Sequence, residues 1–371
     1  MTHLFPIVFI LVFIPVHYLA YTRVIRRLHI RPRTLTLFRY LLILNMAGIT
    51  GYVIFRYFIS VPNLLYFLSS LSIGVGMLLF LGTIIYELLH WLQHRLPLNP
   101  ERRKFFKRGS DLGFLALGTS YVGAGVYGGT KKPLIQNVKV TQKLFDTALK
   151  IAQISDMHIG GLIDQAFVKE SVKRINALDV DLVVITGDLI DQDVTQIMPA
   201  LEELRHLRSR YGSYFILGNH EYFHGAQQCM DAVKALGIRV LENESIKINA
   251  AEPFWLIGLY DYFGYRYGSF KPDILKATAT IDDDAPQLLL AHQPKMITRL
   301  YGHTPQLILS GHTHGGQIWP FNYLVELQQP YLKGLHEYKK GSFIYVNSGI
   351  GFWGPPMRLG SQAEITLITW S

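Results

Sequence analysis

The sequence predicts an α-helical membrane region followed by an α/β domain. Three long apolar runs lie within the first 129 residues, and from Thr130 onwards short β-branched runs alternate with helical patterns and with charges of both signs. The chain has 371 residues, of which 49% are hydrophobic, and its mean hydropathy is +0.20. These values are high for a soluble protein, so we expect a membrane anchor over residues 1–129 and a globular domain over residues 130–371.

Three runs in the anchor are close to the roughly 20 residues that an α-helix needs to cross a bilayer. They are Leu4–Tyr21, Tyr40–Phe55 and Leu64–Tyr86. A fourth run, Leu112–Tyr127, is shorter and rich in glycine and alanine, so it is either a short span or a segment at the membrane interface. The sequence therefore predicts three to four transmembrane helices and a multi-pass protein of the inner or plasma membrane.

The basic residues of the chain are concentrated in the anchor. Residues 1–129 carry 13 Lys and Arg against three acidic residues, a net charge of +10, whereas residues 130–371 have a net charge of −1. Arginines gather between the first two spans and after the third, and the turn 60–63 has no charge. The positive-inside rule therefore places both basic stretches in the cytoplasm and the N-terminus and turn 60–63 outside. The charge of the second domain argues against a nucleic-acid partner.

The basic stretch 101–108 precedes the fourth apolar run. Its arginine pair and its two phenylalanines, followed by a weakly hydrophobic segment, resemble a twin-arginine export signal within the chain, and an ordinary basic loop before a short span is the alternative. Both interpretations place the second domain outside the cytoplasm. If residues 112–127 only lie at the interface, the domain stays on the cytoplasmic face. Cys229 is the single cysteine, which excludes an intrachain disulfide.

Five predicted strands of the second domain end in residues that ligate metals or transfer protons. These strands and the residues that follow them are Lys150–Ser155 with Asp156 and His158, Leu182–Thr186 with Asp188, Tyr214–Leu217 with Asn219 and His220, Gln287–Leu290 with His292, and Leu307–Leu309 with His312 and His314. Helical patterns separate them at 165–178, 196–209, 225–236 and 295–300, and another strand is expected at Trp255–Leu259. Because ligands gather at the carboxyl ends of strands in α/β sheets, we expect these side chains to converge.

The loop Ser310–Gly316 holds two histidines separated by one residue, with glycines on both sides. Neutral imidazole is the commonest protein ligand for first-row metals, and the glycines give the backbone freedom to turn both rings. A His-x-His sequence alone is weak evidence of a metal site. The Asp, Asn and His residues at the ends of the other strands are what make this loop a predicted metal-binding loop.

The five blocks resemble, in order and spacing, those of the calcineurin-like metallophosphoesterases over about residues 150–371, and no block is missing. The resemblance implies a four-layer α/β/β/α metallophosphoesterase sandwich with two metal ions. It assigns one ion to Asp156, His158, Asp188 and His314, and the other to Asp188, Asn219, His292 and His312, so that Asp188 bridges them. It also gives His220 the catalytic role of protonating the leaving-group oxygen or of stabilising the charged transition state, with an acidic neighbour orienting the ring. The ending Tyr345–Gly351, with Arg358, looks like the membrane-attached or exported branch of the family.

The predicted ligand set determines which metals and which chemistry we expect. Mixed nitrogen and oxygen ligation suits two divalent Mn, Fe or Zn ions, and two such ions at roughly 3.5–4 Å clamp phosphate oxygens and lower the pKa of a bridging water. Arg358 is a candidate substrate-binding phosphate clamp, or else a surface arginine. Asp191 and Glu221 are candidate supports for the ligands, or else solvated caps. The histidines outside the blocks are predicted not to be ligands: His206, His224, His303 and His336.

Aromatic residues are frequent in the later loops of the second domain. They are Tyr260, Tyr262, Phe263, Tyr265, Tyr267, Trp319, Phe321, Tyr323, Tyr331, Phe352 and Trp353. Several of them are candidates for a substrate rim or for contact with lipid headgroups, and ordinary packing of loops on the sheets is the alternative.

Together, the sequence predicts a membrane-anchored binuclear-metal phosphoesterase. We expect it to hydrolyse a phosphoester or pyrophosphate bond in a lipid-linked or envelope substrate, by attack of a metal-bridging hydroxide. The expected partners are membrane lipids and a phosphorylated small-molecule or lipid-linked substrate. One alternative is a UDP-2,3-diacylglucosamine pyrophosphate hydrolase of lipid A synthesis, which requires a cytoplasmic domain. Another is a non-catalytic membrane sensor or scaffold.

Overall fold

The computed structural model describes residues 4–28, 30–59, 61–95, 97 and 99–371, and the chain forms two compact units. One unit, the helical anchor, comprises the residues up to Thr130 together with Gly354–Met357. The other, the α/β domain, comprises Lys131–Trp353 and Arg358–Ser371. Ser60, in the predicted outer turn, lies outside the described residues.

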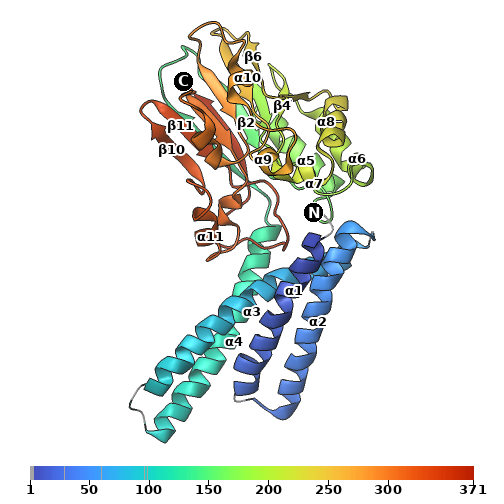
Figure 1. The fold of residues 1–371 in the computed structure, drawn as a ribbon, viewed down its shortest axis with the longest axis vertical. Helices are drawn as coiled ribbons and strands as arrows, with labels where there is room; N and C mark the ends of the chain where they lie inside the picture. Colours follow the sequence, from blue (N-terminus) through green and yellow to red (C-terminus); the bar gives the residue numbers. More distant parts are fainter. Residues whose placement is uncertain (1–3, 29, 60, 96, 98) are drawn as a thin grey trace. The chain divides into compact units, whose positions relative to one another are not determined.

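The anchor consists of four helices (Figure 1). They are α1 (Leu4–Leu19), which continues through a π turn (Ala20–Val24) and a 3₁₀ turn (Ile25–Arg27), then α2 (Pro32–Tyr57), α3 (Asn63–Arg95) and α4 (Pro100–Thr130). Three segments of the described helices are long and apolar enough to cross a membrane, namely Ile7–Arg27, Pro32–Arg56 and Asn63–Arg95. The basic stretch 101–108 and the apolar run 112–127 lie in one continuous helix, α4, which is not among these segments.

Small residues and paired charges hold the anchor helices together. A Cβ atom on Gly76 of α3 would lie 2.6 Å from the ring of Phe13 in α1, so only glycine allows this approach. Arg27 forms an ion pair with Glu87 at 2.8 Å. In α4, Asp111 accepts a hydrogen bond from the Tyr86 hydroxyl of α3 at 2.9 Å. Arg27, Glu87 and Asp111 therefore have polar partners within the anchor, as membrane-embedded charges generally do.

Two six-stranded sheets form the centre of the α/β domain (Figure 1). The first has the order β1-β12-β2-β3-β4-β5, with bounds Leu134–Val140, Glu364–Trp370, Leu149–Ile154, Leu182–Ile185, Ser213–Phe215 and Arg239–Val240. The second has the order β10-β11-β9-β8-β7-β6, with bounds Gly334–Lys339, Ser342–Val346, Leu307–Ser310, Gln287–Leu290, Phe254–Gly258 and Glu244–Ile248. Neighbours β2, β3, β4 and β5 are parallel, as are β7, β8, β9 and β11, so the carboxyl ends of the strands that carry the predicted ligands share an edge in each sheet.

The sheets lie between two layers of helices, because alternate side chains of a strand face opposite sides. In β3, Leu182 and Val184 join an apolar cluster that also contains Leu288 and Leu309 from the second sheet. The alternate side chains Val183 and Ile185 join a cluster with residues of the flanking helices α5 (Gln165–Asn176), α6 (Val194–Glu202) and α8 (Ala226–Ala235). A third cluster covers the other face of the second sheet with α10 (Ile274–Thr278) and a 3₁₀ turn (Pro294–Arg299). The predicted α/β/β/α sandwich is confirmed.

The remaining short elements of the domain connect strands. They are a 3₁₀ turn at Glu203–His206, α7 (Asn219–Phe223), α9 (Gly264–Tyr267), a 3₁₀ turn at His314–Gly316 and α11 (Asn322–Glu326). Two of them begin at predicted site residues, Asn219 and His314.

Candidate metal centre

The predicted metal ligands and His220 follow the carboxyl ends of β2, β3, β4, β8 and β9, so that both sheets contribute to one place. Five of the predicted ligands have a positive φ between 50° and 71°: Asp156, His158, Asp188, His312 and His314. Positive φ is uncommon for residues other than glycine, although Asp and His adopt it more readily than most, and it clusters at functional sites. The left-handed backbone at these five strand ends is therefore a feature that marks a candidate functional site.

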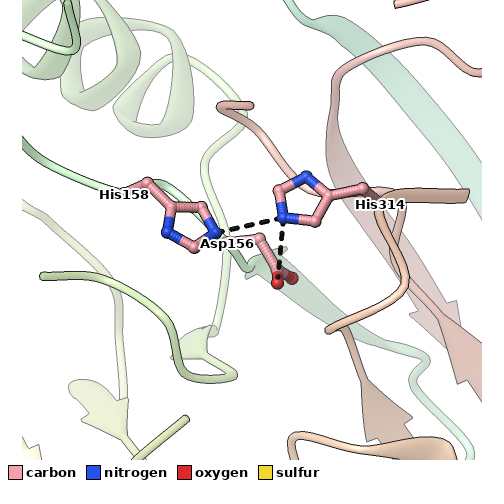
Figure 2. A group of neighbouring side chains, drawn as sticks. All are labelled: Asp156, His158 and His314. Atoms are coloured by element: carbon pink, nitrogen blue, oxygen red, sulfur yellow. Dashed lines mark hydrogen bonds and ion pairs between the residues drawn. The ribbon is translucent and has the colours of Figure 1, made fainter. Parts of the chain in front are cut away.

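Asp156, His158 and His314 form the first group of candidate ligands, and all three are buried (Figure 2). The Nε2 atoms of His158 and His314 are 3.0 Å apart. The Nε2 atom of His314 lies 3.6 Å from Oδ1 of Asp156. Three donor atoms from two different sheets therefore face one another, as the ligands of a single ion must.

Asp188, His292 and His312 form a second group, whose donor atoms lie within 4.8 Å of one another. The Nε2 atom of His292 is 3.3 Å from Oδ2 of Asp188 and 3.2 Å from Oδ1 of Asn219. The same Oδ2 atom of Asp188 is 3.9 Å from Nε2 of His158 in the first group. Asp188 thus lies between the two groups, where a bridging carboxylate would lie.

The chemistry of these donors fits divalent metal ions. Nδ1 of His292 is 2.7 Å from the carbonyl oxygen of Thr186, and since a carbonyl only accepts, Nδ1 carries the proton. Nε2 then faces Asp188 and Asn219 and, once deprotonated, would present its lone pair to a metal ion there, as in histidines that bind metals. Two buried carboxylates supply negative charge, and the other donors are imidazole nitrogens and an amide oxygen.

The electrostatics of the centre favour the metal-ligating forms of Asp188, His312 and His314. Burial, together with the charge of His292, lowers the pKa of His312 to about 3, so its imidazole is neutral at pH 7. Burial and the neighbouring His158 likewise lower the pKa of His314 well below its ordinary value. Burial acts to raise the pKa of Asp188, but the charges of His292 and His220 outweigh it and hold that pKa well below the usual range.

His220 lies at the edge of both groups and has its own carboxylate partner. Its Nδ1 donates to Oδ1 of Asp191 at 2.6 Å, and its Nε2 lies 3.9 Å from Oδ2 of Asp188. Asp191 is buried, so it is not the solvated cap that was the alternative for this residue. It also lies 3.8 Å from Nε2 of His224, a neighbour that the sequence blocks gave no reason to expect. Asp191 therefore holds the His220 ring with Nε2 facing the centre.

Glu221 is fully buried and fixes the loop that carries Asp188. Its Oε1 accepts hydrogen bonds from the amides of Leu189 and Ile190, and its Oε2 accepts from those of Asp188 and Gly218. Burial and the Asp188 carboxylate raise the pKa of Glu221 to about 7, and the backbone amides act in the opposite direction. The Glu221 carboxylate, like that of Asp191, is buried and holds a residue of the centre in position. It is not a solvated helix cap.

Arg358 is 1% exposed, so the alternative of a surface arginine is wrong. Its guanidinium donates to backbone carbonyls and to one hydroxyl: the carbonyls of His314, Ser348, Gly349 and Gly351, and Oγ of Ser361. Because protein acceptors occupy these donors, the geometry gives no support to the predicted phosphate clamp. Arg358 instead ties the segment 348–351 to the loop that carries His314. The amide of Gly351 in turn donates to the carbonyl of Asp156 at 3.1 Å, so this segment is hydrogen-bonded to the backbone of the first ligand group.

The four histidines that were predicted not to be ligands lie outside both groups of candidate ligands within the described residues. They are His206, His224, His303 and His336. His336, for example, contacts the carbonyl of Lys333 at 2.8 Å.

Known proteins with similar sequences carry the same domain. A family model described as calcineurin-like phosphoesterase matches residues 149–316. A metallophosphoesterase of Helicobacter pylori is 36% identical over 327 residues, which cover 88% of this chain and 87% of the relative. A transmembrane protein with metallophosphoesterase domain of Danio rerio is 31% identical over 347 residues, 89% of this chain and 79% of the relative. Among solved structures, a dimetal phosphatase from Danio rerio matches with a TM-score of 0.41 and 13% identity, over 61% of this chain and 100% of that one.

Proposed function

Because the chain belongs to the calcineurin-like metallophosphoesterases and is a metal-dependent phosphoesterase, we propose that it hydrolyses a phosphoester or pyrophosphate bond in a lipid-linked substrate at a two-metal centre. The two-metal proposal rests on the position of Asp188. Its Oδ2 lies 3.3 Å from Nε2 of His292 and 3.9 Å from Nε2 of His158. One carboxylate thus adjoins both ligand groups. The mixed nitrogen and oxygen donors favour Mn, Fe or Zn.

The residues of the centre would have two roles in hydrolysis: most would bind the metal ions, and His220 would transfer a proton. Asp156, His158, Asp188 and His314 would hold one ion, and Asp188, Asn219, His292 and His312 the other. When bound, such a pair supplies positive charge to the phosphate oxygens and lowers the pKa of a water. His220 would donate a proton from Nε2 to the leaving oxygen, and Asp191 keeps the ring oriented.

A substrate at the membrane is supported by the anchor. The described residues include three segments able to span a bilayer, and relatives with this domain include transmembrane proteins. An enzyme tethered to a bilayer meets a lipid-linked substrate at a high effective concentration without any added contact. The alternative of a UDP-2,3-diacylglucosamine pyrophosphate hydrolase uses the same centre and differs in the side of the membrane.

The test of this function is metal-dependent hydrolysis by the purified full chain. We expect hydrolysis of bis-p-nitrophenyl phosphate or p-nitrophenyl phosphate to fall at least roughly 100-fold after EDTA treatment and to return with Mn, Fe or Zn. UDP-2,3-diacylglucosamine is assayed beside them. Hydrolysis that survives complete removal of metal would overturn the proposal, and a marked preference for the sugar nucleotide would favour the alternative substrate.

We propose that the α/β domain lies outside the cytoplasm, because the basic residues 101–108 form the first turns of α4, whose apolar run 112–127 then leads to the domain. Reporter fusions after Thr130 test this orientation. Alkaline phosphatase is expected to be active there and a cytoplasmic fluorescent reporter dark. The opposite pattern would place the domain in the cytoplasm.

A further inference from the structure

We propose that the metal centre has an apolar leaving-group subsite beside His220, with Phe223 and Trp353 as its walls. The inference deepens the proposed function and rests on it, because it assigns the apolar part of the substrate to the alcohol that departs.

Two large aromatic side chains lie beside the His220 ring and remain open to solvent. The ring of Phe223 lies 5.5 Å from that of His220 and the ring of Trp353 lies 6.0 Å from it, both edge-on. Phe223 is 47% exposed and Trp353 is 42% exposed, whereas His220 is 7% exposed. Exposed aromatic area next to a buried reactive group is surface that a ligand can cover favourably.

The orientation of His220 decides which part of the substrate meets these walls. Since Nδ1 is held by Asp191 at 2.6 Å, Nε2 is the atom left to protonate the substrate. In the reaction the water oxygen bonds to phosphorus, the bond from phosphorus to the leaving oxygen breaks, and that oxygen takes the proton of His220. The proton released by the water restores His220. The leaving oxygen must therefore lie within about 3 Å of Nε2, which brings the carbon chain attached to it against the neighbouring rings.

Both walls are fixed by contacts of their own. Phe223 ends helix α7 and packs against Phe263, with ring centroids 5.0 Å apart. The backbone of Trp353 exchanges two hydrogen bonds with the side chain of Gln317, at 2.9 and 3.0 Å. The predicted rim aromatics thus divide: Trp353 forms a wall and Phe263 supports one. Phe223, which the sequence did not single out, is the second wall. Rings held in this way offer apolar area at little cost in side-chain entropy.

The experiment compares leaving groups that differ only in apolar length. Ethyl and hexyl esters are prepared both as phosphate monoesters and as methylphosphonate esters, so that only the alcohol can leave. With the full chain, we expect kcat/KM for the hexyl ester to exceed that for the ethyl ester roughly tenfold, which corresponds to partial burial of four methylene groups. Phe223→Ala and Trp353→Ala should each reduce this ratio to below about threefold, while bound metal per chain stays unchanged.

Leu275→Ala is the matched control, because Leu275 is an apolar side chain, 61% exposed, on α10 and outside the site. Its hexyl-to-ethyl ratio should equal that of the unsubstituted chain. If an alanine variant loses metal or fails to fold, Phe223→Gln and Trp353→Gln replace it. Equal rates on both esters, a ratio unchanged in the variants, or cleavage of nitrophenyl esters without any cleavage of alkyl esters would each overturn the subsite. Absence of metal-dependent hydrolysis of every ester would instead overturn the proposed function.

Discussion

Replacing Asp188 by alanine is expected to remove metal from both positions and to lower kcat/KM by on the order of 10³-fold or more. The Asp188 carboxylate adjoins donor atoms of both ligand groups, through the 3.3 Å and 3.9 Å approaches of its Oδ2 to His292 and His158. Its Oδ1 also accepts the backbone amide of His220 at 2.8 Å. The substitution therefore removes a shared ligand and loosens the residue that protonates the leaving group. Metal per chain, measured by mass spectrometry, and nitrophenyl ester hydrolysis give the two readouts.

Asp193 provides a control five residues away along the same loop. Its side chain is exposed and accepts from the amide of Thr195 at the start of α6, outside both metal groups. Asp193→Ala should cost about 1 kcal/mol of helix capping and leave both metals in place. Two ions per chain and an unchanged rate in Asp188→Ala would contradict the bridging role.

The convergence of the site could be predicted from the sequence because it depends on short-range patterns. An apolar run predicts a buried strand, and the polar residue that follows it is then placed at the strand end. Asp156, Asp188, Asn219, His292 and His312 are brought together in this way. Their roles as ligands remain predictions that the metal measurements above address.

The order of the strands in the first sheet could not be predicted in the same way. Strand β12 lies between β1 and β2, and its Glu364 pairs with Leu134, which is 230 positions earlier in the chain. This pairing depends on which strand edges of the assembled sheet are available for hydrogen bonding. A local sequence pattern does not contain that information. The sequence therefore predicts the five ligand-bearing strands but neither β1 nor β12.

The supports of the site were the least predictable part, because their partners come from distant loops. Arginine is rarely buried, so a solvent-facing role was the natural expectation for Arg358. The carbonyls that hold it belong to residues 314 and 348–351, which come together only in the folded domain. The role of Asp191 was equally hard to predict. A carboxylate three residues after Asp188 is compatible with a helix cap and with a hydrogen-bond partner of a histidine.

Replacing His220 by asparagine is expected to lower the rate by about 10²–10⁴-fold for esters of alkyl alcohols, and by much less for nitrophenyl esters. An alkoxide is a poor leaving group until it is protonated, whereas nitrophenolate leaves without help. Loss of the acid therefore appears as a steeper dependence of rate on the pKa of the leaving alcohol. The alkyl and nitrophenyl esters are both measured at saturating metal. Asp191→Asn should also make the rate depend more steeply on the pKa of the leaving alcohol, but by a smaller amount.

The dependence of the rate on the pKa of the leaving alcohol also distinguishes a general acid from a metal ligand at His220. His158, Asp191 and His220 have donor atoms close enough to one another to hold an ion, so the positions of the side chains admit His220 as a ligand. A ligand variant loses metal and slows every ester by a similar factor. An acid variant keeps both ions and slows only those esters whose alcohol must be protonated. The 2.6 Å contact of Nδ1 with Asp191 leaves Nε2 alone to face the centre in either role, so metal content per chain together with the ester dependence decides between them.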